Sequence, residues 1–379
     1  MNLQKNSFRT LTNNSYIVKV PLGDRSYPIY IGANLLKNIG KLCVDHKVAR
    51  TVVVITDKNV ARYYLQMVKA SLEKKNFFVR SIVLPPRERQ KSLQTAEKIY
   101  TKLLEWNIER NSAIIALGGG VIGDLAGFIA ATYQRGIGFI QIPTSLLAQV
   151  DSSIGGKVGI NHPLAKNMIG AFFQPQFVLA DTSVLKTLPK RELICGMGEV
   201  VKYGVILDKK FFSFIEQNLN KALSGDTKIL SSIIRRCCEL KAHVVSRDEK
   251  EQNVRAILNF GHTIGHALER AGKFTHLKHG EAILYGMIAE TNIAFAAGMI
   301  SFADKERMEC LIQKIPIPSL RSLRLRNTEL FGTMRKDKKV KDGFIRMTLP
   351  YAIGKISMPM TVDEQLIDRA LDYVKLYGL

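Results

Sequence analysis

The sequence is poor in cysteine and holds a single tryptophan among 379 residues. Its five cysteines are an odd number, are spread over the whole chain and form no CxxC spacing; they are Cys43, Cys195, Cys237, Cys238 and Cys310. Such a pattern argues against a disulfide scaffold and against a thiolate metal cage. We therefore expect a reducing, cytoplasmic environment.

Long apolar runs are also missing. No stretch approaches the roughly 18 uninterrupted apolar residues that a membrane helix needs, because Asp124, Glu281 and Glu290 interrupt the most apolar regions. The first 15 residues are polar and contain no apolar core of signal-peptide length. These absences predict a soluble protein that is not exported and has no membrane partner.

Acidic residues are scarce relative to basic ones, 33 against 55, which gives a net charge of +22. Such an excess can attract nucleic-acid backbones. The cations are scattered, however, with short runs such as residues 336–341, and they are not interleaved with aromatic side chains. We expect no nucleic-acid partner; an anionic small-molecule substrate accounts for part of the charge, and a solvated face for much of the rest.

Short apolar runs alternate with helical patterns through the first half of the chain. The predicted strands are Tyr16–Val20, Ser26–Ile31, Thr51–Thr56, Phe77–Leu84, Ala113–Leu117 and Gly136–Ile142. Helical patterns at 59–74 and 92–106 separate the middle strands. This βαβαβ series predicts an α/β domain over residues 1–185, built on a parallel Rossmann-like sheet.

Helical patterns dominate the rest of the chain. They cover about 190–204, 208–222, 228–247, 254–271, 279–297, 303–313 and 362–376, with a short strand pair within Met347–Ile356. We therefore predict an all-α domain over residues 186–379. Length supports this division, because a chain of 379 residues has room for two to three domains of about 150 residues.

A glycine-rich turn follows the strand that ends at Leu117. Gly118, Gly120 and Gly123 satisfy GxGxxG between a strand and a helix, where a pyrophosphate can approach backbone amides at the helix N-terminus. A tight turn without a ligand is the alternative. An ordinary Rossmann unit has an acidic residue about 20 positions later, whereas here Asp57 ends a strand before the glycines.

Histidines gather near residue 270. Four of the seven lie within 18 residues, and His262 and His266 are four apart, a spacing that places two imidazoles on one side of a helix. The helix around Glu199 offers a carboxylate in an apolar, glycine-flanked run. Two histidines and one glutamate would form a catalytic metal site; a hydrogen-bonded structural cluster is the alternative.

A third polar group surrounds glycines at residues 142–163. Lys157 lies between glycines with no acidic neighbour within five residues, so it is a candidate for binding an anion, and Lys166 and Asn167 follow closely. A polar surface loop is the alternative at this segment.

Taken together, four segments resemble the 3-dehydroquinate synthase family of the shikimate pathway. They are residues 118–124 (GGGVIGD), 149–157 (QVDSSIGGK), 198–204 (GEVVKYG) and 259–267 (NFGHTIGHA), and the resemblance extends from about Tyr16 to the closing helix. It implies the dehydroquinate synthase-like fold, bound NAD, and a Zn²⁺ or Co²⁺ ion held by Glu199, His262 and His279. His266 then becomes a substrate contact instead of a metal ligand.

The same resemblance assigns the other site residues. It implies substrate-binding or catalytic roles for Asp151, Lys157, Lys166, Asn167, Lys202, Lys241, Arg255, Asn259, His266, Arg135 and Lys338, with Lys338 favoured over Lys339. Arg135 would reach the substrate of a neighbouring subunit in a homodimer. NAD contacts are implied for Asp57, Asn59, Glu88, Lys91, Gly119, Gly120, Val121, Ile122, Gly123, Asp124, Thr144, Ser145, Leu147, Lys157, Lys166 and Thr187.

The implied activity is that of a phosphate-eliminating lyase that converts 3-deoxy-D-arabino-heptulosonate 7-phosphate to 3-dehydroquinate and phosphate. Bound NAD would accept a hydride and return it, so no reduced cofactor would accumulate. Two other enzymes remain as alternatives: a related sugar phosphate cyclase, such as 2-deoxy-scyllo-inosose synthase, and a metal-dependent polyol dehydrogenase. A dehydrogenase would accumulate NADH and needs no site for phosphate.

Overall fold

The computed structural model describes residues 15–321, 323, 325–335 and 344–377. Its chain divides into two compact units. Unit 1 comprises residues up to Leu188 together with Gly225–Ser246, and unit 2 comprises Pro189–Ser224 together with Arg247 onward.

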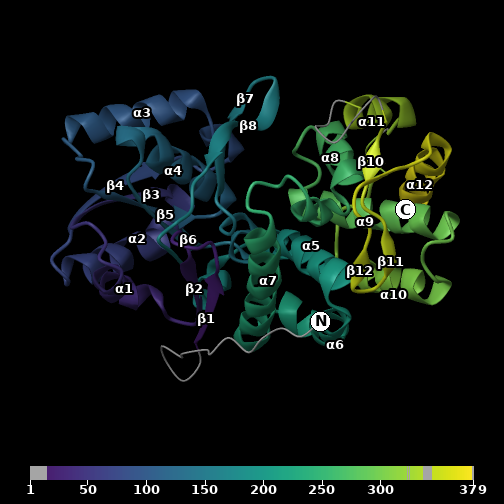
Figure 1. Cartoon of the computed structure of the whole chain (residues 1–379), viewed down its shortest axis with the longest axis horizontal. Coiled ribbons are helices and arrows are strands. Elements are labelled where there is room, and N and C mark those ends of the chain that lie inside the picture. The colour runs from purple at the N-terminus through teal and green to yellow at the C-terminus, as the bar shows by residue number, and fades with distance from the viewer. Residues whose placement is uncertain (1–14, 322, 324, 336–343, 378–379) are drawn as a thin grey trace. The chain divides into compact units, whose positions relative to one another are not determined.

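A seven-stranded sheet forms the centre of unit 1 (Figure 1), in the order β1-β2-β9-β6-β5-β3-β4. Only β1 runs antiparallel to its neighbour; the other pairs of this sheet are parallel. The strands are β1 (Tyr16–Val20), β2 (Tyr27–Gly32), β3 (Thr51–Asp57), β4 (Phe78–Leu84), β5 (Ala113–Gly118), β6 (Gly138–Pro143) and β9 (Phe177–Asp181). Inner strands such as β5 are buried along their whole length, as expected for a parallel sheet covered on both faces.

Helices cover the two faces of this sheet (Figure 1). On one face, side chains such as Ile99 and Ile129 share a buried apolar core with Ile114 of β5. The helices of unit 1 are α1 (Ile39–Asp45), α2 (Lys58–Glu73), α3 (Leu93–Glu105), α4 (Gly120–Thr132) and α7 (Thr227–Arg247), whose last residue passes into unit 2. These elements confirm the α/β fold that the sequence predicts.

Two features of unit 1 were not predicted. A hairpin of β7 (Lys157–His162) and β8 (Ala165–Phe172) occupies a segment for which the sequence analysis lists no strand. The short strand β9 inserts between β2 and β6. Both follow a π-helical turn at Ala148–Ser152, and such turns occur frequently at functional sites.

Helix α7 belongs to unit 1, although the sequence places its residues in the second domain. Three side chains of α7 explain the difference. Ser231 donates a hydrogen bond to Thr182, the Cys238 thiol to the carbonyl of Gln149, and Lys241 to Asp151. The helical pattern was right, but it could not tell which unit its buried face would contact.

Unit 2 is mostly helical. Its helices are α5 (Lys190–Leu207), α6 (Lys209–Leu223), α8 (His262–Ala271), α9 (His279–Ala296), α10 (Phe302–Gln313), α11 (Asn327–Met334) and α12 (Glu364–Tyr377). Short strand pairs are formed by β10 (Arg346–Met347) with β13 (Met360–Thr361) and by β11 (Pro350–Ala352) with β12 (Lys355–Ile356). Helix α9 is apolar nearly all round and almost wholly buried, so it is the central helix of this unit.

The predicted helix over 254–271 is broken. Residues Val254–Asn259 form a 3₁₀ segment, and α8 begins only at His262. Gly261 separates the two with a φ of +78°, a left-handed conformation that glycine adopts readily. No helix in the described part of the chain is long and apolar enough to cross a membrane.

Candidate active site

The glycine turn of unit 1 lies at the carboxyl edge of the sheet, beside the end of β3. Thr56 pairs with Leu117, which places Asp57 next to Gly118. A Cβ atom on Gly118 would lie 2.6 Å from the Ile122 side chain, so only glycine fits there.

The first helical hydrogen bond of α4 runs from Gly123 N–H to the Gly119 carbonyl. The N–H groups at Gly120, Val121 and Ile122 therefore precede the helical ladder and remain available to a phosphate. Asp57 itself caps α2 by accepting hydrogen bonds from the N–H groups of Asn59 and Val60. These features fit a dinucleotide pyrophosphate at the turn.

Lys91 connects two other predicted site residues, Asp124 and Asn167. Lys91 is 5% exposed, and its ammonium donates to a carboxylate oxygen of Asp124 at 2.5 Å and also to the side chain of Asn167. Burial raises the pKa of Asp124, against the lowering effect of the Lys91 ammonium. Asn161, which was not predicted, supports the group by accepting from Asn167 N–H at 3.0 Å and donating to Glu88 at 2.8 Å.

The π-helical turn positions a second lysine. Lys241 Nζ lies 2.6 Å from Asp151 Oδ1 and 2.8 Å from the Asp151 carbonyl oxygen. Gln149 anchors this turn to the sheet, because its side-chain amide donates to the carbonyls of Pro143 and Asp181 at the ends of β6 and β9. The structure thus brings Asp151 and Lys241 together although they are 90 residues apart in the chain.

The metal-ligand candidates converge within unit 2. Ligand atoms of Glu199, His262 and His279 all lie within 4.8 Å of one another. Glu199 Oε1 is 3.5 Å from Nε2 of His262 and 3.4 Å from Nε2 of His279. Two imidazole nitrogens and one carboxylate are the donor set of a catalytic zinc site, so these residues fit a divalent metal.

Outer contacts orient both imidazoles. His262 Nδ1 lies 3.0 Å from the Phe260 carbonyl, which requires a proton on Nδ1 and leaves Nε2 as the donor to a metal. His279 Nδ1 lies 3.4 Å from Glu269 Oε2. Burial lowers the pKa of His279, but Glu199 and Glu269 raise it to about 9. A cation at Nε2 would therefore replace a proton that two carboxylates already favour.

Lys202 and His266 stand beside the ligand cluster. Lys202 forms a buried ion pair with Glu199 Oε2, whereas the distances to the two imidazoles are to Oε1. The rings of His266 and His279 are 5.7 Å apart between centroids, so His266 does share the cluster's surroundings. His266 also joins Glu269 and His279 in a second group of ligand-type atoms, a possibility that the helical spacing of His262 and His266 does not reveal.

The 3₁₀ segment before α8 contains Arg255 and Asn259. Arg255 is 2% exposed, and its guanidinium donates to the Glu249 carbonyl. Asp248 accepts from the backbone N–H groups of Gln252, Asn253 and Arg255 at 2.7–3.0 Å and so fixes this loop. Burial alone would raise the pKa of Asp248, but these N–H donors hold it below its usual value.

Four other predicted residues are placed as follows. Arg135 lies in a 3₁₀ turn and is exposed, and Lys157 is exposed at the start of β7. The Thr187 hydroxyl lies 2.5 Å from that of Tyr64, which the sequence did not single out. Lys338 and its alternative Lys339 lie outside the described residues.

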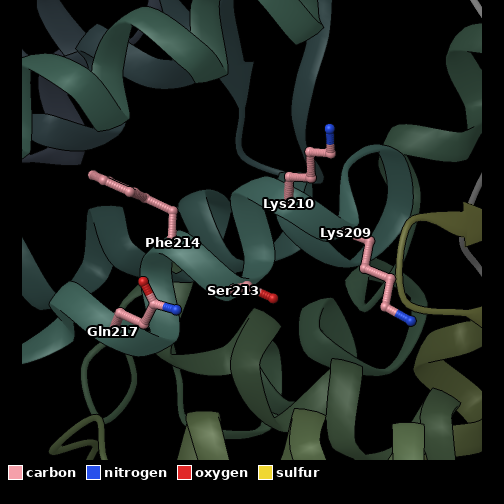
Figure 2. A pocket seen from close by; sticks show the side chains of 5 residues that line it. All are labelled: Lys209, Lys210, Ser213, Phe214 and Gln217. Carbon is pink, nitrogen blue, oxygen red and sulfur yellow. The ribbon is translucent and has the colours of Figure 1, made fainter.

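An open hollow over α6 contains none of the predicted site residues. It is lined by Lys209, Lys210, Ser213, Phe214 and Gln217, and Figure 2 shows the two lysines pointing in different directions. With no histidine or carboxylate in its lining, this hollow lacks the acid–base and metal-ligating groups of the histidine cluster.

Comparison with known proteins decides the family. Residues 81–195 match the family model of the 3-dehydroquinate synthase N-terminal region, and residues 196–340 match that of the C-terminal region. The chain belongs to the 3-dehydroquinate synthase family. A 3-dehydroquinate synthase of Desulforamulus reducens is 45% identical over 347 residues, covering 92% of this chain and 97% of the relative.

Two further proteins extend this comparison. A 3-dehydroquinate synthase of Thermodesulfovibrio yellowstonii is 44% identical over 355 residues, covering 94% of this chain and 99% of the relative. A solved structure of 2-deoxy-scyllo-inosose synthase, in complex with carbaglucose-6-phosphate, NAD⁺ and Co²⁺, superimposes with a TM-score of 0.85 at 28% identity. That match covers 95% of this chain and 99% of the other.

Proposed function

We propose that this protein is a lyase with 3-dehydroquinate synthase activity, which converts 3-deoxy-D-arabino-heptulosonate 7-phosphate to 3-dehydroquinate and phosphate. The observation that carries the proposal is the convergence of Glu199, His262 and His279 in a chain whose relatives, 44–45% identical over nearly their whole length, carry that name. The related cyclase of known structure is less similar, at 28% identity.

Two groups complete the site. Glu199 Oε1 and the Nε2 atoms of His262 and His279 would hold Zn²⁺ or Co²⁺, and the glycine turn with Asp57 would hold NAD. A divalent metal supplies Lewis-acid polarisation of a hydroxyl or carbonyl oxygen, and NAD supplies a reversible hydride acceptor. The cyclase in the comparison structure was solved with NAD⁺ and Co²⁺, which supports both assignments.

The chain's own residues bind charge and hold protons. Lys241 and Arg255 are buried cations, 5% and 2% exposed. They would therefore bind the carboxylate and phosphate of the substrate more strongly than exposed cations could. Lys202 neutralises the outer oxygen of Glu199. His266, next to His279, would orient the phosphate or hold its proton during elimination.

Two finer assignments belong to the same proposal. We place the protein in the cytoplasm, because all five cysteines are free and four of them are buried. We also propose a homodimer, in which Arg135 would reach the neighbouring subunit's substrate; its exposure at the surface of unit 1 is compatible with that role.

The test follows phosphate release from the heptulosonate phosphate together with absorbance of reduced nicotinamide. We expect phosphate release that requires both NAD and a divalent metal, disappears with a chelator, returns with Zn²⁺ or Co²⁺, and leaves no lasting NADH. His262→Ala should lose metal and activity together, and retention of both would remove His262 from the ligand set. NADH that accumulates and persists would indicate a dehydrogenase. Turnover of another sugar phosphate, without turnover of the heptulosonate phosphate, would indicate a different cyclase.

A further inference from the structure

We propose that the ion pair between Arg191 and Glu281 positions His279 against Glu199 and thereby sets the affinity of the metal site. Neither residue is among the predicted site residues. The inference rests on the proposed function, because it presumes that Glu199, His262 and His279 hold a metal.

Arg191 holds the start of α9 from both sides of His279. Its Nε and Nη2 atoms donate to the two oxygens of Glu281 at 2.7 and 2.8 Å, and Nη2 also donates to the carbonyl of His276. Glu281 is fully buried and accepts a further hydrogen bond from Lys278 N–H at 2.7 Å. A bidentate pair of this kind fixes orientation as well as distance.

Helices α5 and α9 meet by backbone contact where the two ligands lie. A Cβ atom on Gly280 would be 1.7 Å from the Cys195 carbonyl oxygen, and one on Gly198 would be 2.4 Å from the Gly280 carbonyl oxygen. Gly198 precedes Glu199 and Gly280 follows His279. The contact therefore leaves little room for one ligand to move relative to the other, provided that the helices stay pressed together.

A second ion pair has the opposite polarity. Glu192, next to Arg191 on α5, pairs with Lys278, next to His279. Each helix thus contributes one cation and one anion, so the pairing favours a single alignment of α5 with α9. Arg191 contacts Glu281 and the His276 carbonyl, and neither residue belongs to the Glu199, His262 and His279 cluster, so Arg191 acts as a positioning residue.

The test compares Arg191→Met and Arg191→Lys with Arg307→Met. Arg307 forms a similar bidentate pair with Glu216 between α10 and α6 and is 36% exposed against 44% for Arg191. Each full-length variant is freed of metal and titrated with Co²⁺ against a competing chelator, while visible absorption reports the ligand geometry. Thermal unfolding of the metal-free proteins gives the stability change separately.

We expect Arg191→Met to weaken Co²⁺ binding about 10- to 100-fold and to alter the absorption band. Arg191→Lys keeps the positive charge but cannot form the bidentate contact, so its Co²⁺ affinity should fall less. Arg307→Met should bind Co²⁺ like the wild type, even if it loses as much thermal stability as Arg191→Met. Wild-type affinity in Arg191→Met overturns the proposal, and so does an equal loss in Arg307→Met.

If Arg191→Met does not fold, Glu281→Gln replaces it, because the amide keeps the volume and one acceptor oxygen. Weakened Co²⁺ binding with an altered band supports the proposal in that variant, and wild-type binding overturns it. A wild-type protein that binds no Co²⁺ refutes the metal site itself and this proposal with it. By contrast, a wild type that binds Co²⁺ while the Arg191 variants match it leaves the proposed function intact.

Discussion

Replacing Gly198 with alanine tests whether backbone contact between α5 and α9 sets the ligand geometry. The new Cβ would lie 2.4 Å from the Gly280 carbonyl oxygen, whereas ordinary contacts begin at 3.4 Å, so the helices must separate by about 1.0 Å (3.4 − 2.4). Overpacking of this kind costs about 1–3 kcal/mol of folding free energy. A metal site tolerates only about 0.2 Å, so the larger effect should appear in metal binding.

We expect Gly198→Ala to fold, to melt at a lower temperature and to bind Co²⁺ about 10- to 100-fold more weakly, measured by chelator competition. Gly332→Ala is the matched control, because a Cβ there meets nothing within 4 Å and the residue lies inside α11. That control should keep its metal affinity and gain roughly 0.5–1 kcal/mol of stability. Unchanged Co²⁺ affinity in Gly198→Ala would refute the reasoning.

Two further predictions concern buried charges. Lys241→Met should lower kcat/KM at least about 100-fold with the fold intact, because the developing negative charge loses a buried cation; a wild-type rate would place Lys241 outside the active site. Asp248→Asn should cost about 1–3 kcal/mol at pH 7, measured by urea unfolding. Because the pKa of Asp248 is lowered in the folded protein, its stabilisation is present above the unfolded pKa of about 3.9 and is lost as the pH falls through the folded value. When the pH falls from 7 to below 4, the free energy of unfolding should therefore decrease less in Asp248→Asn than in the wild type. Equal decreases in the two proteins would contradict this.

Patterns that depend on local sequence predicted the structure well. The apolar run at residues 51–56 and the glycines that follow Leu117 give a buried strand and a strand-to-helix turn, because both depend on neighbouring residues. The helical spacing of His262 and His266 was also correct, but it could not show which of the two faces Glu199. That choice depends on contact between three helices, and the family resemblance supplied it.

Other features depend on partners that sequence does not reveal. Strand β9 is a short segment buried at every residue, and without an alternation of buried and exposed positions it cannot be recognised as a strand until it pairs with β2 and β6. Gln149 and Arg191 are ordinary polar residues in the sequence, and their roles arise from carbonyls and carboxylates that lie far away in the chain. Gly261 was a readable signal of the break before α8, because glycine inside a helical pattern often marks an end.

The return of α7 to unit 1 has a consequence for how the protein can be divided. The polypeptide passes between the two units three times, after residues 188, 224 and 246. A fragment that ends at Leu188 would lack Lys241, which pairs with Asp151, and Cys238, whose thiol donates to the Gln149 carbonyl. Neither half can therefore be obtained by a single cut, and a protease that nicks one crossing leaves two covalent links in place.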